Sequence, residues 1–319
     1  MSRTALCAWA LIGILLVAVV FAPVPGDEVW VGRLHDFVHA PIFGCVAVLL
    51  LIGLRRTRQF APLGFGSQYA VALAGAVALG FVTEVAQIPA GRDASWLDVR
   101  SDLLGAVSFV ALWAAFDPPA RMRFASMRRR GAALLVGVAL LGYLFAPVAQ
   151  SIVEYSRRRS QFPVIADFSR RPDMYFTWCS NVVVDFTPLP AALSATRGES
   201  AAHVRFLPHP YPGLNFHEPW SDWRGYASLA IELANPAQRP LELVVRVHDA
   251  RHNNEFNDRY NKRITLPAGA RDVFRFPLKD IRSAPAGRVM DLANIRGVIV
   301  FRANDSPPDE MYVSRLWLE

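Results

Sequence analysis

The sequence has only three cysteines among its 319 residues: Cys7, Cys45 and Cys179. So small and odd a number excludes a disulfide framework, and we expect Cys179, the one cysteine of the second half, to be a lone buried thiol. The second half also lacks a nucleophile elbow, a glycine loop that could cradle phosphate and an assignable pair of glycosidase carboxylates. No common hydrolase or nucleotide-binding class is therefore indicated by a motif.

Charged residues are scarce in the first 150 positions, which are rich in Ala, Leu, Val and Gly. The formal net charge of the whole chain is nevertheless +7. Its basic residues concentrate between apolar segments, in clusters at residues 55–58 and 121–130. Loops with such an excess of arginine are typical of the cytoplasmic side of a membrane protein. The positive charge therefore indicates membrane topology, and we expect no nucleic-acid partner.

Long apolar runs dominate the first half. Five of them are close to the roughly 20 residues that cross a hydrocarbon core of about 30 Å. The first could instead be a cleaved signal peptide, but Pro23 directly after the cleavage point would hinder a peptidase, so we expect an uncleaved anchor. The predicted spans are residues 5–22, 36–54, 68–88, 98–116 and 131–150.

The loop charges predict the orientation of these spans. Arg3 precedes the first span, and the two arginine clusters follow the second and the fourth. An alternating path places all three on the cytoplasmic side. The N-terminus is then cytoplasmic and the chain after residue 150 extracytoplasmic or periplasmic, although arginines at 157–159 violate the rule. The sequence thus predicts an integral protein of the cytoplasmic (inner) membrane with membrane lipid as a partner.

The few ionisable residues of the apolar half gather at span ends that this topology brings to the outer face. Ionisable groups cost several kcal/mol at membrane depth and are rarely placed there without a partner or a task. His35 and His39 are one helical turn apart and share a helix face. The candidate polar site consists of His39, Glu84, Arg92 and Asp98, with Asp36, Gln87 and Asp102 beside them.

Three interpretations of this site stay open. The side chains could form a buried network that fastens the helix ends, with Arg92 paired to a carboxylate. A histidine and a carboxylate could share proton transfer at the membrane surface while Arg92 holds an anionic group such as phosphate. Metal ligands could also come from His35, His39, Glu84 and Asp98, although no His-Glu-x-x-His motif accompanies them.

Three strings, LHDFVHAPIFG, FVTEVAQ and GRDASWLDVRSDLLG, resemble the VanZ-like membrane proteins. That family shows an Asp/Lys-x-x-His pair, a Glu-x-x-Gln pair, an Arg, and Asp-x-x-x-Asn-x-x-Gly. The sequence departs from the pattern at Asp102, where the family usually has Asn. The resemblance implies a cell-envelope role, the family being named for a member associated with glycopeptide (teicoplanin) resistance, and it supplies no reaction. It covers about residues 1–118, and the matching residues are Asp36, His39, Glu84, Gln87, Arg92, Asp98 and Gly105.

The second half is predicted to be all-β. Short alternating runs such as VVVDF, SLAIELA and LELVVRVHD are punctuated by Pro, Gly and Asn, which is typical of an antiparallel sandwich or jelly roll. This half is similar to galactose-binding-like jelly rolls, which occur as carbohydrate-binding domains. The predicted fold class is an α-helical membrane bundle of about five spans, residues 1–150, followed by a charged linker at 151–160 and a β-sandwich at 161–319.

A polar loop, HDARHNNEFNDRYN, and the upstream string HEPWSDWRGY carry the residue types of sugar sites. Amides, carboxylates and arginine bind hydroxyls, and aromatic faces cover the apolar side of a sugar ring. The competing interpretation is that Asn and Asp only shape the loop and that the tryptophans fill the core. A structural calcium ion would fit the resemblance, but no ligand set stands out. The candidate sugar-binding residues are Trp220, Trp223, Asp249, His252, Asn254, Asp258 and Arg259.

The sequence does not decide whether the protein is an enzyme. The favoured hypothesis is a cell-envelope protein with an outward-facing polar site at the membrane surface and a glycan-binding domain, its partner being a glycan or a lipid-linked envelope substrate. One alternative is a membrane-embedded hydrolase or transferase that uses His39, Glu84 and Arg92. Another is a non-catalytic scaffold.

Overall fold

The computed structural model describes residues 2–21, 26–60, 62–90, 94–123, 126–169, 172–196, 198–220, 222–302 and 310–319. The chain divides into two compact units, Met1–Val153 and Glu154–Glu319, which we call the helical unit and the β unit. The expected linker at 151–160 is not a separate segment, because helix α6 (Met127–Gln161) runs through it. Neither Gly nor Pro interrupts this stretch, so nothing in it breaks the helix.

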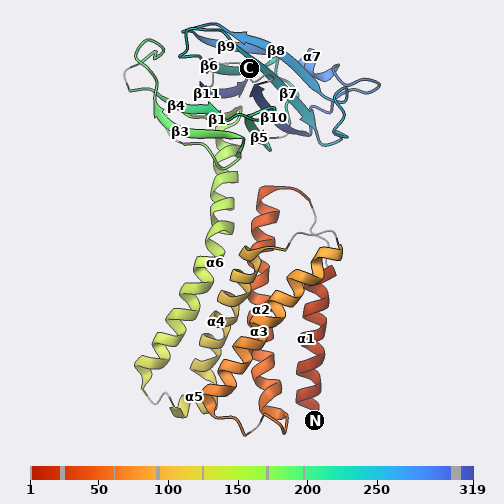
Figure 1. The fold of residues 1–319 in the computed structure, drawn as a ribbon, viewed down its shortest axis with the longest axis vertical. Helices are drawn as coiled ribbons and strands as arrows, with labels where there is room; N and C mark the ends of the chain where they lie inside the picture. The colour runs from red at the N-terminus through yellow and green to blue at the C-terminus, as the bar shows by residue number, and fades with distance from the viewer. Residues whose placement is uncertain are drawn as a thin grey trace. The chain divides into compact units, whose positions relative to one another are not determined.

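Helices build the first unit (Figure 1). Helix α2 begins at Val29 and not near residue 36, where its span was predicted, so that His39 lies well inside the helix. The short helices η1 (Ile88–Ala90) and α5 (Pro118–Arg123) follow the third and fourth long helices. Within the described ranges, five helices are long and apolar enough to cross a membrane: α1 (Arg3–Phe21), α2 (Val29–Arg56), α3 (Phe65–Gln87), α4 (Trp96–Phe116) and α6.

Glycines set the closest helix contacts in this unit. Helices α2 and α4 pack along each other. A Cβ atom on Gly105 would lie 2.2 Å from the carbonyl oxygen of Ala40, and one on Gly44 would lie 2.4 Å from the ring of Phe109. Residues without a side chain let two helix backbones approach at these points. The approach at Ala40 brings the neighbouring His39 against the turn of α4 that precedes Gly105.

One end of the helical unit carries arginines from both clusters. Helix α5, with Arg121 and Arg123, lies at the same end as the N-terminus of α1 (Figure 1). Arg55, from the last turn of α2, donates to both carboxylate oxygens of Asp117 at 2.8 and 2.9 Å. The hydroxyl of Tyr69 donates to the same carboxylate at 2.7 Å. Buried charge at this end is therefore paired.

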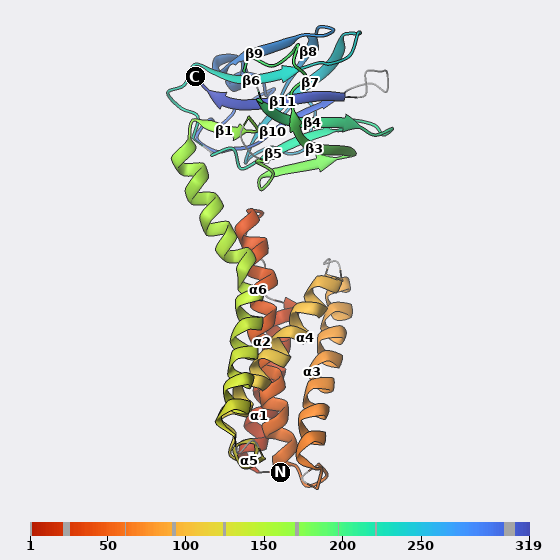
Figure 2. The same cartoon turned by 90° about the vertical axis from the view of Figure 1, so that its left-hand side faces the viewer.

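The β unit is a sandwich-like domain of two antiparallel sheets (Figure 2). One sheet has the order β3-β4-β11-β6-β9, with β1 also paired to β11, and the other has the order β2-β5-β10-β7-β8. Helix α7 (Leu278–Arg282) follows β9. The strands are β1 (Val164–Asp167), β2 (Thr177–Ser180), β3 (Val182–Pro188), β4 (Ser200–Phe206), β5 (Gly213–His217), β6 (Ser228–Ala234), β7 (Leu241–Asp249), β8 (Tyr260–Leu266), β9 (Arg271–Pro277), β10 (Ile295–Arg302) and β11 (Glu310–Leu318).

Strand alternation decides which side chains fill the core between the sheets. On β7, Leu241, Leu243, Val245 and Val247 point inward and are buried in one apolar cluster with residues from both sheets. Successive side chains on a strand point to opposite faces, so the residues between them lie on the outer face of the five-stranded sheet. Cys179 is exposed, and the prediction of a buried thiol is wrong, because its strand β2 lies at the edge of this sheet.

Arg158, one of the three arginines that violate the positive-inside rule, has a structural role. Arg158, at the end of α6, is buried in the β unit and donates from Nη1 to the carbonyl oxygen of His217 at 2.6 Å. Its guanidinium carbon lies 3.7 Å from the ring centroid of Phe176. Burial lowers the pKa of Arg158 to about 10. This arginine is thus part of the β-unit core, which explains its position without a topological signal.

Candidate functional site

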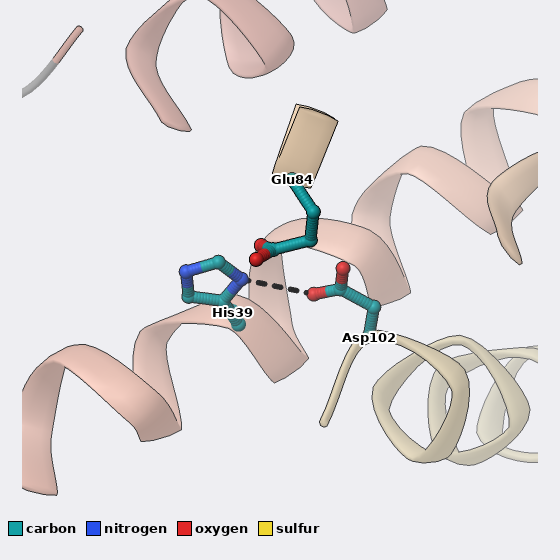
Figure 3. A group of neighbouring side chains, drawn as sticks. All are labelled: His39, Glu84 and Asp102. Carbon is teal, nitrogen blue, oxygen red and sulfur yellow. Dashed lines mark hydrogen bonds and ion pairs between the residues drawn. The ribbon is translucent and has the colours of Figure 1, made fainter. Parts of the chain in front are cut away.

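Three buried side chains from three different helices meet inside the helical unit (Figure 3). His39 of α2, Glu84 of α3 and Asp102 of α4 are 3%, 2% and 1% exposed. The Nδ1 atom of His39 lies 3.1 Å from Oδ1 of Asp102. One donor atom from each residue lies within 4.8 Å of the other two. We call this group the buried triad.

The start of α4 is built around Glu84. The side chain of Ser95 caps the helix by accepting from the backbone N–H groups of Leu97 and Asp98 at 3.2 and 3.4 Å. The backbone N–H of Ser95 in turn donates to Oε2 of Glu84 at 2.8 Å. Capping of this kind fixes where the helix begins. It therefore also fixes how far Asp102, two turns along α4, lies from α3.

Other residues of the predicted polar site have separate places. Gln87 donates from Nε2 to the carbonyl oxygen of Val19 at 3.2 Å and ties α3 to α1. Asp98 is buried in the first turn of α4 but outside the triad. Asp36 lines a hollow of about 320 Å³ that also contains Arg33 and Arg100. Arg92 lies outside the described residues.

The three residues that converge lie in the interior of the helical unit, where α4 packs closely on α2. The membrane side that this group faces stays a prediction. The metal-type group contains Asp102 in place of His35 and Asp98.

A second candidate site lies on the outer face of the five-stranded sheet in the β unit. It is a groove of about 630 Å³. The register places Asn215, Ile299, Arg246 and Asn261 side by side across β5, β10, β7 and β8. We call this the sheet groove; its lining residues are Ser180, Tyr211, Gly213, Asn215, Val244, Arg246, Phe256, Arg259, Asn261, Arg263, Ile299 and Phe301.

The sheet groove is cationic. Three of its lining residues are arginines, and none of the described lining residues is Asp or Glu. Burial, and to a smaller extent the positive charge of Arg259, lowers the pKa of Arg246 to about 10. Burial also lowers the pKa of Arg259. Both guanidinium groups remain protonated near neutral pH, so each is a cation without a matching anion in the groove.

Several polar atoms of the groove are buried and have no hydrogen-bond partner among the described residues: Nε of Arg246, Nε of Arg259, and Oδ1 of Asn215 and Asn261. Buried polar atoms are nearly always satisfied in folded proteins. An Nη2 of Arg246 lies 2.9 Å from Nε2 of His252, which holds the guanidinium in place. These atoms are available to a polar ligand or to water.

Exposed aromatic rings accompany these polar groups. Tyr211 and Phe256, which line the groove, are 66% and 71% exposed, and Trp178 on the same sheet face is 51% exposed. The edge of the Tyr211 ring meets Phe301, with 5.9 Å between centroids. Tyr211 has φ of 59°, a left-handed conformation that is uncommon for a bulky residue. Exposed rings at the rim of a groove offer flat apolar surfaces to a ligand.

Of the seven predicted sugar-binding residues, Arg259 lines the sheet groove. The prediction that Trp223 contacts a sugar is wrong, because its side chain is fully buried and its Nε1–H donates to the carbonyl oxygen of Pro219 at 3.1 Å. Trp220 packs near Phe162, with ring centroids 6.4 Å apart. Asn254 is an exposed residue with φ of 71°, which suits a turn.

The two predicted sugar-binding carboxylates are engaged by one arginine. Arg288 donates from Nη1 and Nη2 to Asp249 at 2.6 and 2.9 Å, and from Nε to Asp258. Asp258 also accepts from the backbone N–H of Asn253 at 3.0 Å. The hydrogen bond from Arg288 lowers the pKa of Asp258 to about 2. Asp249 and Asp258 therefore shape the polar loop, and His252, beside them, supports Arg246.

Most residues of the sheet groove were not predicted from the sequence. Several are alternate positions on predicted strands, such as Val244 and Arg246 on β7 and Arg263 on β8. The signal that could have found them is a polar or basic residue alternating with core-facing residues, as at Arg246 on β7 and Arg263 on β8. It was overlooked because the polar loop has the denser run of Asn, Asp and His.

No family model matches the chain, and no curated protein matches it. Similar solved structures include an exo-β-agarase (TM-score 0.40, 13% identity, 49% of this chain and 25% of that chain). A second agarase has a TM-score of 0.36 and 17% identity, over 48% of this chain and 26% of that chain. The family 11 carbohydrate-binding module from Clostridium thermocellum, in complex with a β-1,3-1,4-mixed-linked tetrasaccharide, has a TM-score of 0.34 and 14% identity, over 44% of this chain and 86% of that chain. The chain thus spans about a quarter of the length of the agarases it matches.

Proposed function

We propose that this chain is a cell-envelope protein whose β unit binds an acidic glycan in the sheet groove. The observation that carries the proposal is the presence of Arg246, Arg259 and Arg263 in a groove whose described lining holds no carboxylate. Arginine binds carboxylate, sulfate and phosphate through paired N–H donors. A saccharide with such a group would supply the missing anion.

The remaining groups of the groove support a sugar as the carrier of that anion. The unpartnered Oδ1 atoms of Asn215 and Asn261 can accept hydrogen bonds from hydroxyl groups. The exposed rings of Tyr211 and Phe256 can lie against the apolar faces of sugar rings. Mostly preformed grooves with a few convergent polar groups are the usual form of a binding site. A glycan uses the amides, the rings and the arginines together.

The helical unit is proposed to anchor this domain in the cytoplasmic membrane. Apolar side chains on the outside of the helices, such as Ile14, Phe81 and Val138, are 63%, 51% and 61% exposed, which suits contact with lipid. The basic end of the unit, with the N-terminus of α1, would face the cytoplasm. The resemblance of residues 1–118 to VanZ-like proteins supports an envelope role, and the ligand would be an envelope glycan or a lipid-linked precursor.

The binding proposal is tested with the full chain in detergent micelles. We expect an oligosaccharide of uronic acids or sulfated sugars to bind at least tenfold more tightly than a neutral oligosaccharide of the same length, since only the acidic ligand pairs with the arginines. Titration calorimetry gives both affinities. Added salt should lower the affinity for the acidic ligand and leave the affinity for the neutral ligand unchanged, because salt screens exposed charges.

Three outcomes would contradict this proposal. Equal affinity for neutral and acidic ligands would mean that the arginines do not select the ligand. Inorganic polyphosphate that binds as tightly as the acidic sugar would mean that charge alone is recognised and that the amides and rings have no part. An absence of binding to every saccharide in the panel would remove the glycan proposal.

The topology proposal has its own measurement. A phosphatase that is active only outside the cytoplasm, fused after Glu319, should be active, and the same enzyme placed after Arg123 in α5 should be inactive. The contrast follows from the arginine clusters, which resist translocation. Activity of the α5 fusion together with silence of the Glu319 fusion would reverse the orientation.

A further inference from the structure

Among the described residues, the two carboxyl groups of the buried triad are matched by one imidazole. Glu84 and Asp102 bring two carboxyl groups together with one imidazole in the interior of an apolar helical unit. Unpaired charge is costly in such surroundings and is tolerated when it is paired or bound to a metal ion. Each carboxyl group also has one oxygen, Oε1 of Glu84 and Oδ2 of Asp102, that is buried and unpartnered among the described residues.

In the observed geometry no hydrogen bond joins these two oxygens to each other or to another described residue. A protonated carboxyl group donates a hydrogen bond, and a buried donor needs an acceptor. Oε2 of Glu84 already accepts from Ser95, and Oε1 makes no hydrogen bond. For Asp102, Oδ1 faces His39 and Oδ2 is likewise left over. A bound cation would satisfy both leftover oxygens at once.

The spacing of the donor atoms suits one ion. Ligand atoms about 2.1 Å from a metal lie about 3.0 to 3.4 Å apart when they are adjacent ligands and up to about 4.2 Å when opposite. The 3.1 Å separation of His39 Nδ1 and Asp102 Oδ1 falls in the adjacent range. The ligand atoms of the three residues lie within 4.8 Å of one another, so a small side-chain rotation would bring all three to bonding distance of one ion. Figure 3 shows both carboxyl groups turned toward the same edge of the imidazole ring.

The helix backbone leaves space at this point. A Cβ atom on Gly80 would lie 2.6 Å from Oδ2 of Asp102, so any side chain there would meet the leftover oxygen. Gly105 permits the close contact of α2 and α4 that brings His39 to Asp102. Gly80 thus lies beside Oδ2 of Asp102, and Gly105 lies against Ala40, the neighbour of His39.

We propose that His39, Glu84 and Asp102 together hold one divalent transition-metal ion of the zinc class. An imidazole and two carboxylates suit zinc, iron or manganese better than magnesium, which prefers oxygen ligands alone. A neutral imidazole, two carboxylates and a divalent cation have no net charge, which suits an apolar interior. Three protein ligands leave at least one coordination position for water, as in catalytic zinc sites. This site is independent of the glycan groove.

The test uses the full chain in detergent, stripped with a chelator, equilibrated with Zn²⁺ and freed of unbound metal. Mass spectrometry of the elements should find about one zinc per wild-type chain. Glu84→Gln and Asp102→Asn should each lower zinc affinity at least tenfold, since loss of even an outer partner of a metal ligand costs about 10–100-fold. Zn²⁺ should raise the unfolding temperature of the wild type, and Mg²⁺ should not.

Asp117→Asn is the matched control. Asp117, directly after α4, is also a buried carboxylate, but it pairs with Arg55 and lies outside the triad. It should keep its zinc whatever it does to stability. X-ray absorption of zinc-loaded wild type keeps the proposal testable if a triad variant fails to fold: nitrogen and oxygen ligands near 2.0–2.2 Å are expected. A wild type that holds no zinc, sulfur ligands from the cysteines, or triad variants that bind zinc normally would each overturn the site.

Discussion

Replacing Arg246 by alanine is expected to weaken the binding of an acidic oligosaccharide to the full chain by about tenfold to a hundredfold. Hydrogen bonds to charged groups contribute about 1.5–3 kcal/mol, and about 1.4 kcal/mol is a factor of ten in affinity. Of the three groove arginines, Arg246 is expected to contribute most to binding. It lies in the middle of the cross-strand row, and its Nε is buried and unpartnered among the described residues. Titration calorimetry against the same ligand measures the change.

Two companion variants separate the contributions of charge and shape. Arg246→Lys keeps the positive charge but loses the planar pair of donors, so an intermediate affinity is expected. Arg239→Ala removes an exposed arginine of the same domain that does not line the groove, and it should bind as the wild type does. Wild-type affinity in Arg246→Ala would show that the ligand does not contact the centre of the groove.

Replacing Trp223 by alanine is expected to destabilise the β unit by about 3–5 kcal/mol, the usual effect of truncating a large buried aromatic residue. Trp223 is fully buried and belongs to the apolar cluster between the two sheets. The loss also leaves the carbonyl oxygen of Pro219 without the donor it has in the wild type. Denaturant unfolding followed by the β-sheet circular dichroism signal measures the effect.

The informative comparison is with an exposed aromatic residue of the sheet groove. Tyr211→Ala should change the unfolding free energy little, because the side chain is mostly exposed, and should weaken glycan binding. Trp223→Ala should do the opposite at temperatures where it remains folded. If Trp223→Ala were as stable as the wild type and had lost glycan binding, Trp223 would be a contact residue and its burial would be irrelevant to function.

Local patterns in the sequence were sufficient for the coarse architecture. Apolar runs of about 20 residues predicted five long helices, and all five occur in the described part of the chain. Period-two alternation predicted antiparallel strands in the second half, which form two sheets. Both patterns are properties of neighbouring residues, so they can be read along the chain. The charged residues of 151–160 predict a linker, whereas α6 continues through them because none of them breaks a helix.

The candidate sites were predicted less well, and for different reasons. In the helical half, family spacing pointed to His39, Glu84 and Asp98, and the converging set differs by one turn of α4, with Asp102 in the centre. In the β half, a dense polar loop was chosen, but Arg288 engages its two carboxylates. Residue type alone could not distinguish a loop whose polar side chains bond to one another from a loop whose polar side chains bind a ligand.

The sequence by itself determined which segments become helices and strands, which end of the helical unit is basic, and which residue types are available for chemistry. Tertiary structure alone decided which of those residues share a site. His39 and Asp102 are 63 positions apart, and the row through Asn215, Arg246, Asn261 and Ile299 depends on pairing between strands distant in the chain. A one-residue slip in that register would turn Arg246 into the core. Helix and strand follow from local periodicity, whereas a site requires long-range contacts that local periodicity does not encode.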